Sequence, residues 1–444
     1  MNMTSQKSHA VSALMSFAAA LVLFLPIRGT AQTLESADPS AFAITPQKFR
    51  FAKPFDDRSS RMTTDVAGNF YIASGLDDTH HLNGFAVIKY SAQGKLLGAF
   101  HFQPKSLSAG FANDVKVDAN GNIYAGGYTL FGALVMSFDP SGKTRWTHLL
   151  GSAFTIDQIG ALALDQSGNV YAGGMQGGSM IVAKFTAEGK LLWQKLHQGT
   201  APGSGVTDVQ LDSKGNLIVF GDTTNAGPGL DTTVLKINPQ GKLLWTRNFT
   251  QSPDFNKVPR AGAVDHNDGI YATGVALNLI TGESFPYTVK YDTNGKLIFA
   301  LTEAGDGGVS VAVDPAGKIL LSGFTLLHGN PVSTASKLDP SGKQVWVTQI
   351  PSSGEIVSDA KGNVFISGGA YTVTKLNPAG TALWTFQASS QFSEFSTTGS
   401  VVDPFGNLIV TGTGFDFNAG QNDIITLKFP RISKPQTANS FSAQ

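Results

Sequence analysis

The chain has 444 residues, a net charge of zero and only 14% charged residues, and it has no basic stripe or acidic tail, so binding to nucleic acid is not expected. It contains no cysteine, which excludes disulfides and cysteine-linked lipids. Glycine accounts for 50 residues, well above the average of about 7%, and indicates a fold with many tight turns.

The N-terminus has the pattern of a secretory signal peptide over residues 1–31. Lys7 precedes an apolar stretch from Ala10 to Leu25, and Gly29-Thr30-Ala31 offers a small-residue cleavage site. An uncleaved anchor is the alternative, but the stretch is shorter than the roughly 20 residues that a membrane span needs. We therefore predict a secreted, periplasmic or cell-surface protein with no transmembrane segment after cleavage, and residues 32–47 as a linker.

From residue 61 onward the chain repeats one pattern, an apolar run, then Asp-x-x-Gly-Asn, then a second apolar run. Residues 117–126 show it clearly as Val-Asp-Ala-Asn-Gly-Asn-Ile-Tyr-Ala-Gly. A turn that closes on glycine in the left-handed region joins two strands, and Asp bonds its own backbone two residues on. This turn chemistry favours a structural role over calcium binding for the eight aspartates, Asp65, Asp118, Asp165, Asp212, Asp265, Asp314, Asp359 and Asp403.

A second hairpin pattern follows each Asp turn, as in Asn238-Pro239-Gln240-Gly241 and Asp339-Pro340-Ser341-Gly342. Each unit therefore carries four strands, named a to d. Strand d has an aromatic residue four positions after its turn glycine, which favours packing between neighbouring sheets over stacking on a sugar. These aromatic residues are Trp146, Trp193, Trp245, Phe299, Trp346 and Trp384.

The repeat period predicts a single β-propeller over residues 48–430. Asp403 follows Asp359 by 44 residues and Asp118 follows Asp65 by 53, close to the roughly 40–50 residues of a four-stranded blade. The eighth unit lacks strand d, and we expect residues 48–55 to supply it, which closes an all-β ring of eight blades. Seven blades and a β-helix are the alternatives. Residues 431–444 are expected to be a disordered tail.

The chain resembles bacterial secreted proteins built from the SBBP β-propeller repeat, through units such as Asn122-Ile123-Tyr124-Ala125-Gly126 followed by Phe138-Asp139-Pro140-Ser141-Gly142. It is also similar to quinoprotein-like, PQQ-type propeller repeats at Gly189–Trp193 and Gly241–Trp245. The resemblance implies an extracellular or cell-surface propeller. The name of the first family implies seven blades, and the count of eight departs from it.

The b–c and d–a loops share the face opposite the tight turns, and they are longer and irregular, so a ligand site is expected there. The predicted loops include residues 197–207, 250–260 and 275–286. Adjacent residues seldom aim at one metal ion, so the cluster at 77–81 does not predict a metal site. The candidate ligand-binding residues are Asp77, Asp78, His80, His81, His101, Asp254, Arg260, Glu283 and Glu394, and further polar groups on these loops are His197, Asp222, Asp231 and Asp416.

These features favour a secreted, monomeric, non-catalytic propeller that binds or scaffolds a protein or polysaccharide partner, with no cofactor. One alternative is a quinoprotein-like oxidoreductase, which the eight-blade count supports, although the chain has no cysteine pair and no acidic residue outside the repeat that stands out as a base. Another is a glycan-active hydrolase or lyase, which needs two carboxylates at a set separation. Asp254, Glu283 and Glu394 are candidates for that pair, and the sequence leaves catalysis undecided.

Overall fold

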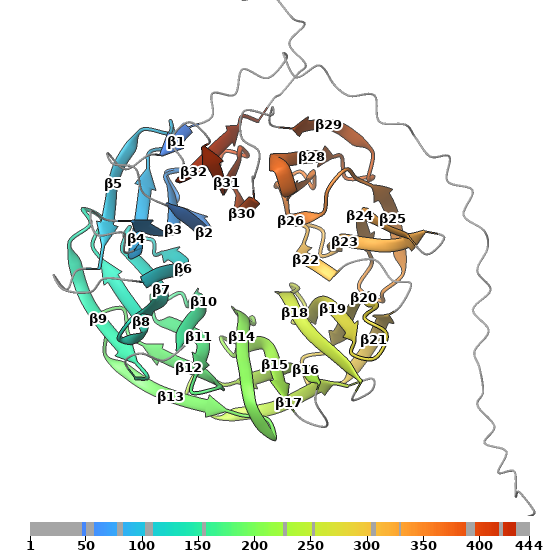
Figure 1. Cartoon of the computed structure of the whole chain (residues 1–444), viewed down its shortest axis with the longest axis horizontal. Coiled ribbons are helices and arrows are strands. Elements are labelled where there is room, and N and C mark those ends of the chain that lie inside the picture. The colour runs from blue at the N-terminus through green and yellow to red at the C-terminus, as the bar shows by residue number, and fades with distance from the viewer. Residues whose placement is uncertain are drawn as a thin grey trace, which may run out of the picture. The chain divides into compact units, whose positions relative to one another are not determined.

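The computed structural model describes residues 47–49, 57–77, 83–102, 110–152, 157–224, 229–250, 254–302, 308–327, 330–387, 396–416 and 421–431. Within these residues, eight four-stranded antiparallel sheets stand around a common axis as the blades of a wheel (Figure 1). The prediction of an all-β propeller with eight blades is therefore confirmed. No helix within these ranges is both long and apolar enough to cross a bilayer.

In blades 1 to 7 the chain runs from the innermost strand to the outermost one. Blades 1 to 4 consist of β2 (Arg58–Thr64), β3 (Phe70–Asp77), β4 (Asn83–Tyr90) and β5 (Leu96–His101); β6 (Gly110–Val117), β7 (Ile123–Thr129), β8 (Gly132–Phe138) and β9 (Thr144–Leu150); β10 (Gln158–Leu164), β11 (Val170–Gln176), β12 (Ser179–Phe185) and β13 (Leu191–His197); and β14 (Ala201–Leu211), β15 (Leu217–Thr224), β16 (Leu230–Ile237) and β17 (Leu243–Phe249).

Blades 5 to 7 consist of β18 (Phe255–Val264), β19 (Ile270–Asn278), β20 (Ser284–Tyr291) and β21 (Leu297–Thr302); β22 (Gly308–Val313), β23 (Ile319–Leu327), β24 (Asn330–Leu338) and β25 (Gln344–Gln349); and β26 (Gly354–Ser358), β27 (Val364–Gly368), β28 (Thr372–Leu376) and β29 (Ala382–Gln387). A single 3-10 turn, Gly369–Tyr371, joins β27 to β28.

Blade 8 combines the two ends of the propeller. Its strands β30 (Ser396–Val402), β31 (Leu408–Asp416) and β32 (Gln421–Phe429) come last in the chain, and β1 (Gln47–Phe49) adds the outermost strand. In this pairing Gln47 lies opposite Thr426 and Phe49 lies opposite Ile424. The predicted closure is confirmed, although the pairing begins at residue 47, and residues 50–56 lie outside the described part of the chain. The shared sheet removes an open edge that would otherwise split the ring.

In each Asp turn, the aspartate carboxylate accepts hydrogen bonds from backbone N–H groups of the same turn. Asp118 Oδ1 accepts hydrogen bonds from the backbone N–H groups of Asn120 and Asn122, at 2.9 and 2.8 Å, and Oδ2 accepts from Asn122 Nδ2 and the Tyr124 hydroxyl, at 2.8 and 2.9 Å. Gly121 has φ +79°, a conformation that glycine adopts without steric cost. The repeated Asp, Gly, Asn and Tyr of the motif thus each make a contact within one hairpin.

Neighbouring blades are joined by a lysine on strand c and an aromatic ring on strand d. Lys236 Nζ lies 2.9 Å from Asp212 Oδ2 in its own blade and donates to the Thr293 carbonyl oxygen of blade 5 at 2.9 Å. The Trp193 indole donates to the Pro239 carbonyl of blade 4 at 3.0 Å and covers Gly241. The predicted packing role of the aromatic residues is confirmed. The lysines that donate to the next blade's turn, here called clamp lysines, are Lys89, Lys184, Lys236, Lys290, Lys337 and Lys428.

The hairpins of blades 4 and 5 are longer than predicted, so several residues expected in loops lie in strands. β14 begins at Ala201, β18 continues through Arg260, and β19 reaches Asn278 before β20 starts at Ser284. Proline occurs in these segments, at Pro202 in β14 and Pro259 in β18. An edge strand tolerates proline, because an N–H group on its open side has no partner to lose.

Candidate functional site

The eight innermost strands enclose a cavity of about 890 Å³ on the axis of the wheel. Each of β2, β6, β10, β14, β18, β22, β26 and β30 contributes side chains to its wall. A volume in this range is typical of small-molecule sites. The regular ring therefore positions a concave, solvent-filled site that draws on every blade.

Most charged groups at this cavity occupy one position of the repeat, four residues before the turn aspartate. Because all innermost strands run in the same direction, this position recurs at similar height around the axis. The residues at this position, from blade 1 to blade 8, are Arg61, Asp114, Ala161, Asp208, Ala261, Ser310, Glu355 and Gly399. Several of them accept a hydrogen bond from the next blade, as Asp114 does from the Leu162 N–H at 2.8 Å.

Arg61 spans the axis from blade 1 to blade 4. Its guanidinium donates to Asp208 Oδ1 at 3.2 Å and to the Thr207 carbonyl at 2.8 Å, and it lies 3.6 Å from Asp114 Oδ2. Lys116 Nζ donates to Asp114 Oδ1 at 2.8 Å. Burial opposes the charge of Arg61, but Asp208, Asp114 and Glu355 together raise its pKa above the ordinary value. Two cations and two carboxylates thus neutralise one another on this side of the cavity.

Glu355 lies at the wall on blade 7. Its Oε2 accepts a hydrogen bond from the Ser400 N–H of blade 8. The Glu355 side chain is exposed to the cavity, but the protein around the cavity limits its hydration. This desolvation raises the pKa of Glu355 to about 7, against the opposing effects of Ser400, Arg61 and Lys116. A carboxyl group that titrates near neutral pH can gain or release a proton as a ligand binds.

Arg260 reaches the cavity through a β-bulge. The register between β18 and β19 shifts between Pro259 and Ala261, which leaves Arg260 unpaired with β19 and turns its side chain toward the axis. The side chain is exposed. It donates no hydrogen bond to any residue that the structure describes. Similar bulges occur at the same repeat position in β6, β10, β14, β22 and β30.

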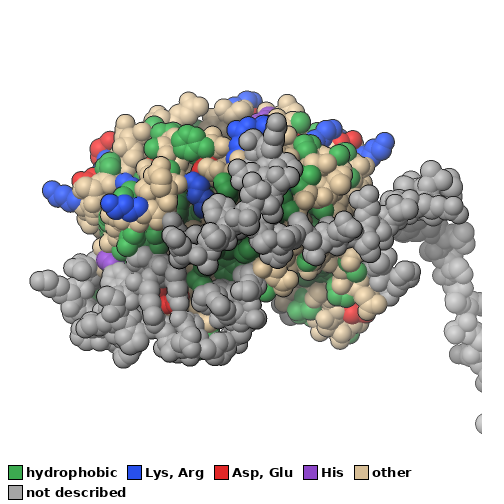
Figure 2. All heavy atoms as spheres, turned by 90° about the horizontal axis from the view of Figure 1, so that it is seen from above, with side chains coloured by type: hydrophobic (Ala, Val, Ile, Leu, Met, Phe, Trp, Pro, Cys, Tyr) green, Lys and Arg blue, Asp and Glu red, His purple; other side chains and the backbone are tan. Residues whose placement is uncertain are grey.

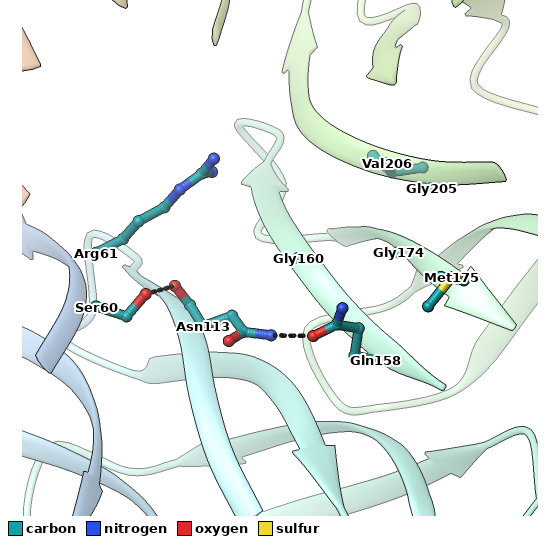
Figure 3. Close-up of a pocket in the computed structure, with 9 residues that line it drawn as sticks. All are labelled: Ser60, Arg61, Asn113, Gln158, Gly160, Gly174, Met175, Gly205 and Val206. Atoms are coloured by element: carbon teal, nitrogen blue, oxygen red, sulfur yellow. Dashed lines mark hydrogen bonds between the residues drawn. The ribbon is translucent and has the colours of Figure 1, made fainter. Parts of the chain in front are cut away.

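A smaller pocket of about 300 Å³ adjoins the axial cavity, and Arg61 lines both. Figure 3 shows the Arg61 side chain extended toward the strand that carries Gly205 and Val206. Asn113 Nδ2 donates to Gln158 Oε1 at 3.3 Å, and the Ser60 hydroxyl donates to the Asn113 carbonyl at 2.8 Å. These bonds join the innermost strands of blades 1, 2 and 3.

The structure does not bring the sequence-predicted site residues together. Arg260 lies at the axial cavity, whereas Asp254 and Glu283 lie at the far end of the blade 5 hairpins, where their carbonyl oxygens accept from the N–H groups of Leu279 and Asn278. His101 ends β5, and burial lowers its pKa. Asp77 ends β3. The remaining candidates, Asp78, His80, His81 and Glu394, lie outside the described residues.

The further polar groups that were predicted on loops lie in strands. His197 ends β13, Asp222 belongs to β15, Asp231 belongs to β16 and Asp416 ends β31. Burial raises the pKa of Asp222 to about 6 and lowers that of His197. Asp231 is buried and accepts from the Thr250 hydroxyl at 2.7 Å. Asp222 and Asp231 lie on adjacent strands of blade 4, whereas His197 belongs to blade 3 and Asp416 to blade 8, so the four residues do not come together at one site.

The sequence does not predict Arg61, Asp114, Asp208 or Glu355 as site residues, because its pattern favours the b–c and d–a loops for a ligand site. An alignment of the eight units on their turn aspartates would have found them, since a charged residue at a position that is Ala, Ser or Gly in other blades stands out. Glu355 belongs to the repeat itself, on its innermost strand, so the expectation about acidic residues outside the repeat does not concern it; burial raises its pKa to about 7.

The cavity wall is a poor match for a flat quinone cofactor. Among the described residues its lining consists of Arg, Lys, Asp, Glu, Gln, Ser, Thr, Met and small or branched aliphatic residues, with no aromatic ring for the cofactor to stack on. Across the described residues, no group of three or more His, Asp or Glu side chains could hold a metal ion.

Comparison with solved structures supports the fold alone. The Dos1 propeller is similar with a TM-score of 0.59 and 12% identity, covering 87% of this chain and 96% of that one. The C-terminal WD40 domain of Sif2 is similar with a TM-score of 0.55 and 9% identity, covering 87% and 99%. No curated protein sequence matches the chain.

The sequence match to a protein family is more specific than these structural similarities. The PQQ_2 family model, described as outer membrane protein assembly factor BamB, matches residues 84–312, which are 229 of the 444 residues. The match runs from β4 of blade 1 into β22 of blade 6, and it agrees with the quinoprotein-like repeats seen at the second hairpin of each unit. The chain therefore belongs to the PQQ_2 family of β-propellers, the family described as outer membrane protein assembly factor BamB.

Proposed function

We propose that this protein is a non-catalytic propeller of the cell envelope that binds a protein partner during the assembly of outer membrane proteins. The description of the family names the assembly of outer membrane proteins, which supports this process. The signal peptide pattern at residues 1–31 supplies a route out of the cytoplasm. The ring, joined blade to blade by hydrogen bonds from the clamp lysines and by aromatic rings, supplies a rigid scaffold.

The observation that favours a protein partner is the apolar end of the blade 5 hairpin. Leu277, Leu279 and Ile280 are 37%, 41% and 77% exposed at the turn between β19 and β20. Two predicted ligand-binding residues, Asp254 and Glu283, are exposed beside them. Exposed apolar side chains with a polar rim are typical of a protein-binding surface. This surface is called the blade 5 tip below.

The opposite face of the wheel differs in character. The tight turns carry exposed lysines in blades 1 to 6, namely Lys95, Lys143, Lys190, Lys242, Lys296 and Lys343. Figure 2 shows charged side chains gathered along the upper part of the molecule in that view. Lysine is depleted from the cores of protein interfaces. Exposed apolar residues follow several of these lysines, as Leu243 and Leu244 follow Lys242, but each such pair adjoins a lysine, so we place the partner site at the blade 5 tip.

Binding of the mature chain to a purified outer membrane β-barrel assembly complex, measured by biolayer interferometry, tests the proposal. We expect saturable binding that Ile280→Asp weakens at least tenfold, because a charge would be buried in an apolar contact. Lys214→Asp, on a tight turn of blade 4, is the matched control and should bind normally. The proposal fails if the unaltered chain shows no binding, or if both variants bind as tightly as it does.

A further inference from the structure

Arg260 and Glu355, two side chains of opposite charge, face the axial cavity and carry hydrogen-bonding atoms that have no partner among the described residues. Arg260 of blade 5 donates to none of the described residues, and Glu355 of blade 7 accepts one hydrogen bond through Oε2 while Oε1 accepts none from them. The described ion pairs do not join the two residues. Both side chains are exposed to the cavity, so an incoming molecule can reach them.

The other charges at the cavity are already matched. Arg61 pairs with Asp208 at 3.2 Å, and Lys116 pairs with Asp114 at 2.8 Å. Asp114 is completely buried and also accepts from the Leu162 N–H. A ligand gains little by competing with these pairs, because it would have to break charge-assisted bonds that the protein already makes. Glu355 also feels the charges of Arg61 and Lys116, but neither cation donates a described hydrogen bond to it, so Arg260 and Glu355 are the charged groups with hydrogen-bonding capacity left for a ligand.

The wall between Arg260 and Glu355 is largely apolar. The innermost strand of blade 6 separates them and contributes Val309 and Ala312, and Ala263 of blade 5 and Val357 of blade 7 extend the same surface. The Ser310 hydroxyl on this wall already accepts from the Ile356 N–H at 3.3 Å. The site therefore offers a cation at one end, a carboxylate at the other and a short aliphatic surface between them.

We propose that the axial cavity binds a small zwitterion, a short peptide with both termini unblocked, whose carboxylate pairs with Arg260 and whose ammonium group pairs with Glu355. The planar guanidinium can hold a carboxylate through two parallel N–H···O bonds. Glu355 Oε1 accepts from the ammonium group while Oε2 keeps its bond to Ser400. Small side chains of the peptide pack against the wall of Ala263, Val309, Ala312 and Val357.

Calorimetric titration of the mature chain with trialanine tests this site directly, because the peptide can be blocked at either end. We expect saturable binding of trialanine, and a loss of at least tenfold on N-acetylation or on C-terminal amidation. Single alanine and dialanine define the length that spans the site. Inorganic phosphate and acetate serve as probes for a simple anion site at Arg260.

Variants assign each end of the peptide to its residue. In Glu355→Gln, trialanine and its N-acetylated form should bind equally, and in Arg260→Gln, trialanine and its amide should bind equally. Arg58→Gln, at an exposed arginine of β2 that does not line the cavity, should behave as the unaltered chain. Thermal unfolding of each variant verifies that it folds.

The proposal is overturned if trialanine gives no binding at about millimolar concentration, the weak end of specific affinity. It is overturned equally if blocking either end leaves affinity unchanged, or if phosphate and acetate bind as tightly as trialanine, which would indicate an anion site only. These comparisons use the unaltered chain, so a variant that fails to fold does not remove the test. They are also independent of partner binding at the blade 5 tip.

Discussion

Arg61 and Asp208 are 147 residues apart in the chain, yet the guanidinium of one donates to the carboxylate of the other at 3.2 Å across the axis of the propeller. The pair joins blade 1 to blade 4 through the interior, whereas all the clamp lysines join neighbouring blades. The Arg61 side chain is 34% exposed and Asp208 is 18% exposed. Water in the cavity therefore weakens the pair but does not remove it.

Replacing either partner should lower stability. We expect Arg61→Met or Asp208→Asn to cost about 1–2 kcal/mol, less than the roughly 3–5 kcal/mol of a fully buried pair, because the cavity hydrates both groups. Urea unfolding of the two single variants and the double variant gives the coupling, which we expect at about 0.5–1 kcal/mol. A coupling of zero would show that the contact contributes nothing.

Lys236→Met should be far more damaging. The lysine side chain is 5% exposed and its partner Asp212 is 0% exposed, so the variant leaves a buried carboxylate without its cation. The Thr293 hydroxyl oxygen loses its lysine donor, and the Thr293 carbonyl oxygen keeps only the Trp245 indole, at 3.3 Å. We expect a loss of about 3–5 kcal/mol in the free energy of unfolding. Lys214→Met, on an exposed turn of the same blade, is the control and should change it by less than about 0.5 kcal/mol.

Comparing Gly241→Ala with Gly177→Ala should separate the cost of backbone strain from the cost of a steric clash with Trp193. A Cβ at this position would lie 2.9 Å from Trp193 Cγ, and φ is +84°. Gly177→Ala shares the positive φ, at +54°, but its Cβ would meet nothing within 4 Å. We expect Gly177→Ala to lower the free energy of unfolding by about 1 kcal/mol from strain alone, and Gly241→Ala to lower it by roughly 1–3 kcal/mol more. Equal thermal shifts would contradict a close fit between ring and turn.

The closing strand β1 can be tested with two truncations. A chain that begins at Gln47 keeps β1, and a chain that begins at Arg50 loses it. We expect the shorter chain to unfold more easily by about 2 kcal/mol, since each backbone hydrogen bond contributes about 1 kcal/mol. Loss of the strand also exposes the edge of β32, so size-exclusion chromatography should show more association. Identical stability and size would exclude a closing role for β1.

Glu355 should make stability depend on pH. Its pKa in the folded protein is about 7, above the ordinary 4.5, so the protonated group stabilises the fold fully below pH 4.5 and this contribution is lost as the pH rises through 7. Glu355→Gln keeps a neutral group at all pH values. The melting temperature of this variant, minus that of the unaltered chain, should therefore rise between pH 4.5 and 8. A difference that stays flat across this pH range would refute the raised pKa.

Much of the fold could be predicted because its determinants are local. The turn glycines, the Asp that bonds its own backbone and the aromatic residue on strand d each act within one hairpin or on the adjacent blade. Gly121, Asp118 and Trp193 behave as their sequence context indicates. Even the closure by β1 could be predicted, because blade 8 visibly lacks a strand and an apolar segment precedes blade 1.

The site could not be predicted in the same way. Arg260 stands at the end of the predicted loop 250–260, but the innermost strand of blade 5 continues through it, and a bulge turns its side chain toward the axis. The sequence around Glu355 does not predict its raised pKa, because the burial that causes it exists only when the blades have closed around the cavity. Asp254 and Glu283 kept their predicted face and lie far along the hairpins from Arg260.

By itself, the sequence determined the repeating hairpin, the number of blades and the strand that joins the two ends, because turn chemistry and strand periodicity act over a few residues. Only the tertiary structure decided which charges meet at the axis. Those contacts link residues as far apart in the chain as Arg61 and Asp208, and their distances depend on the radius of the closed ring, which no short segment encodes.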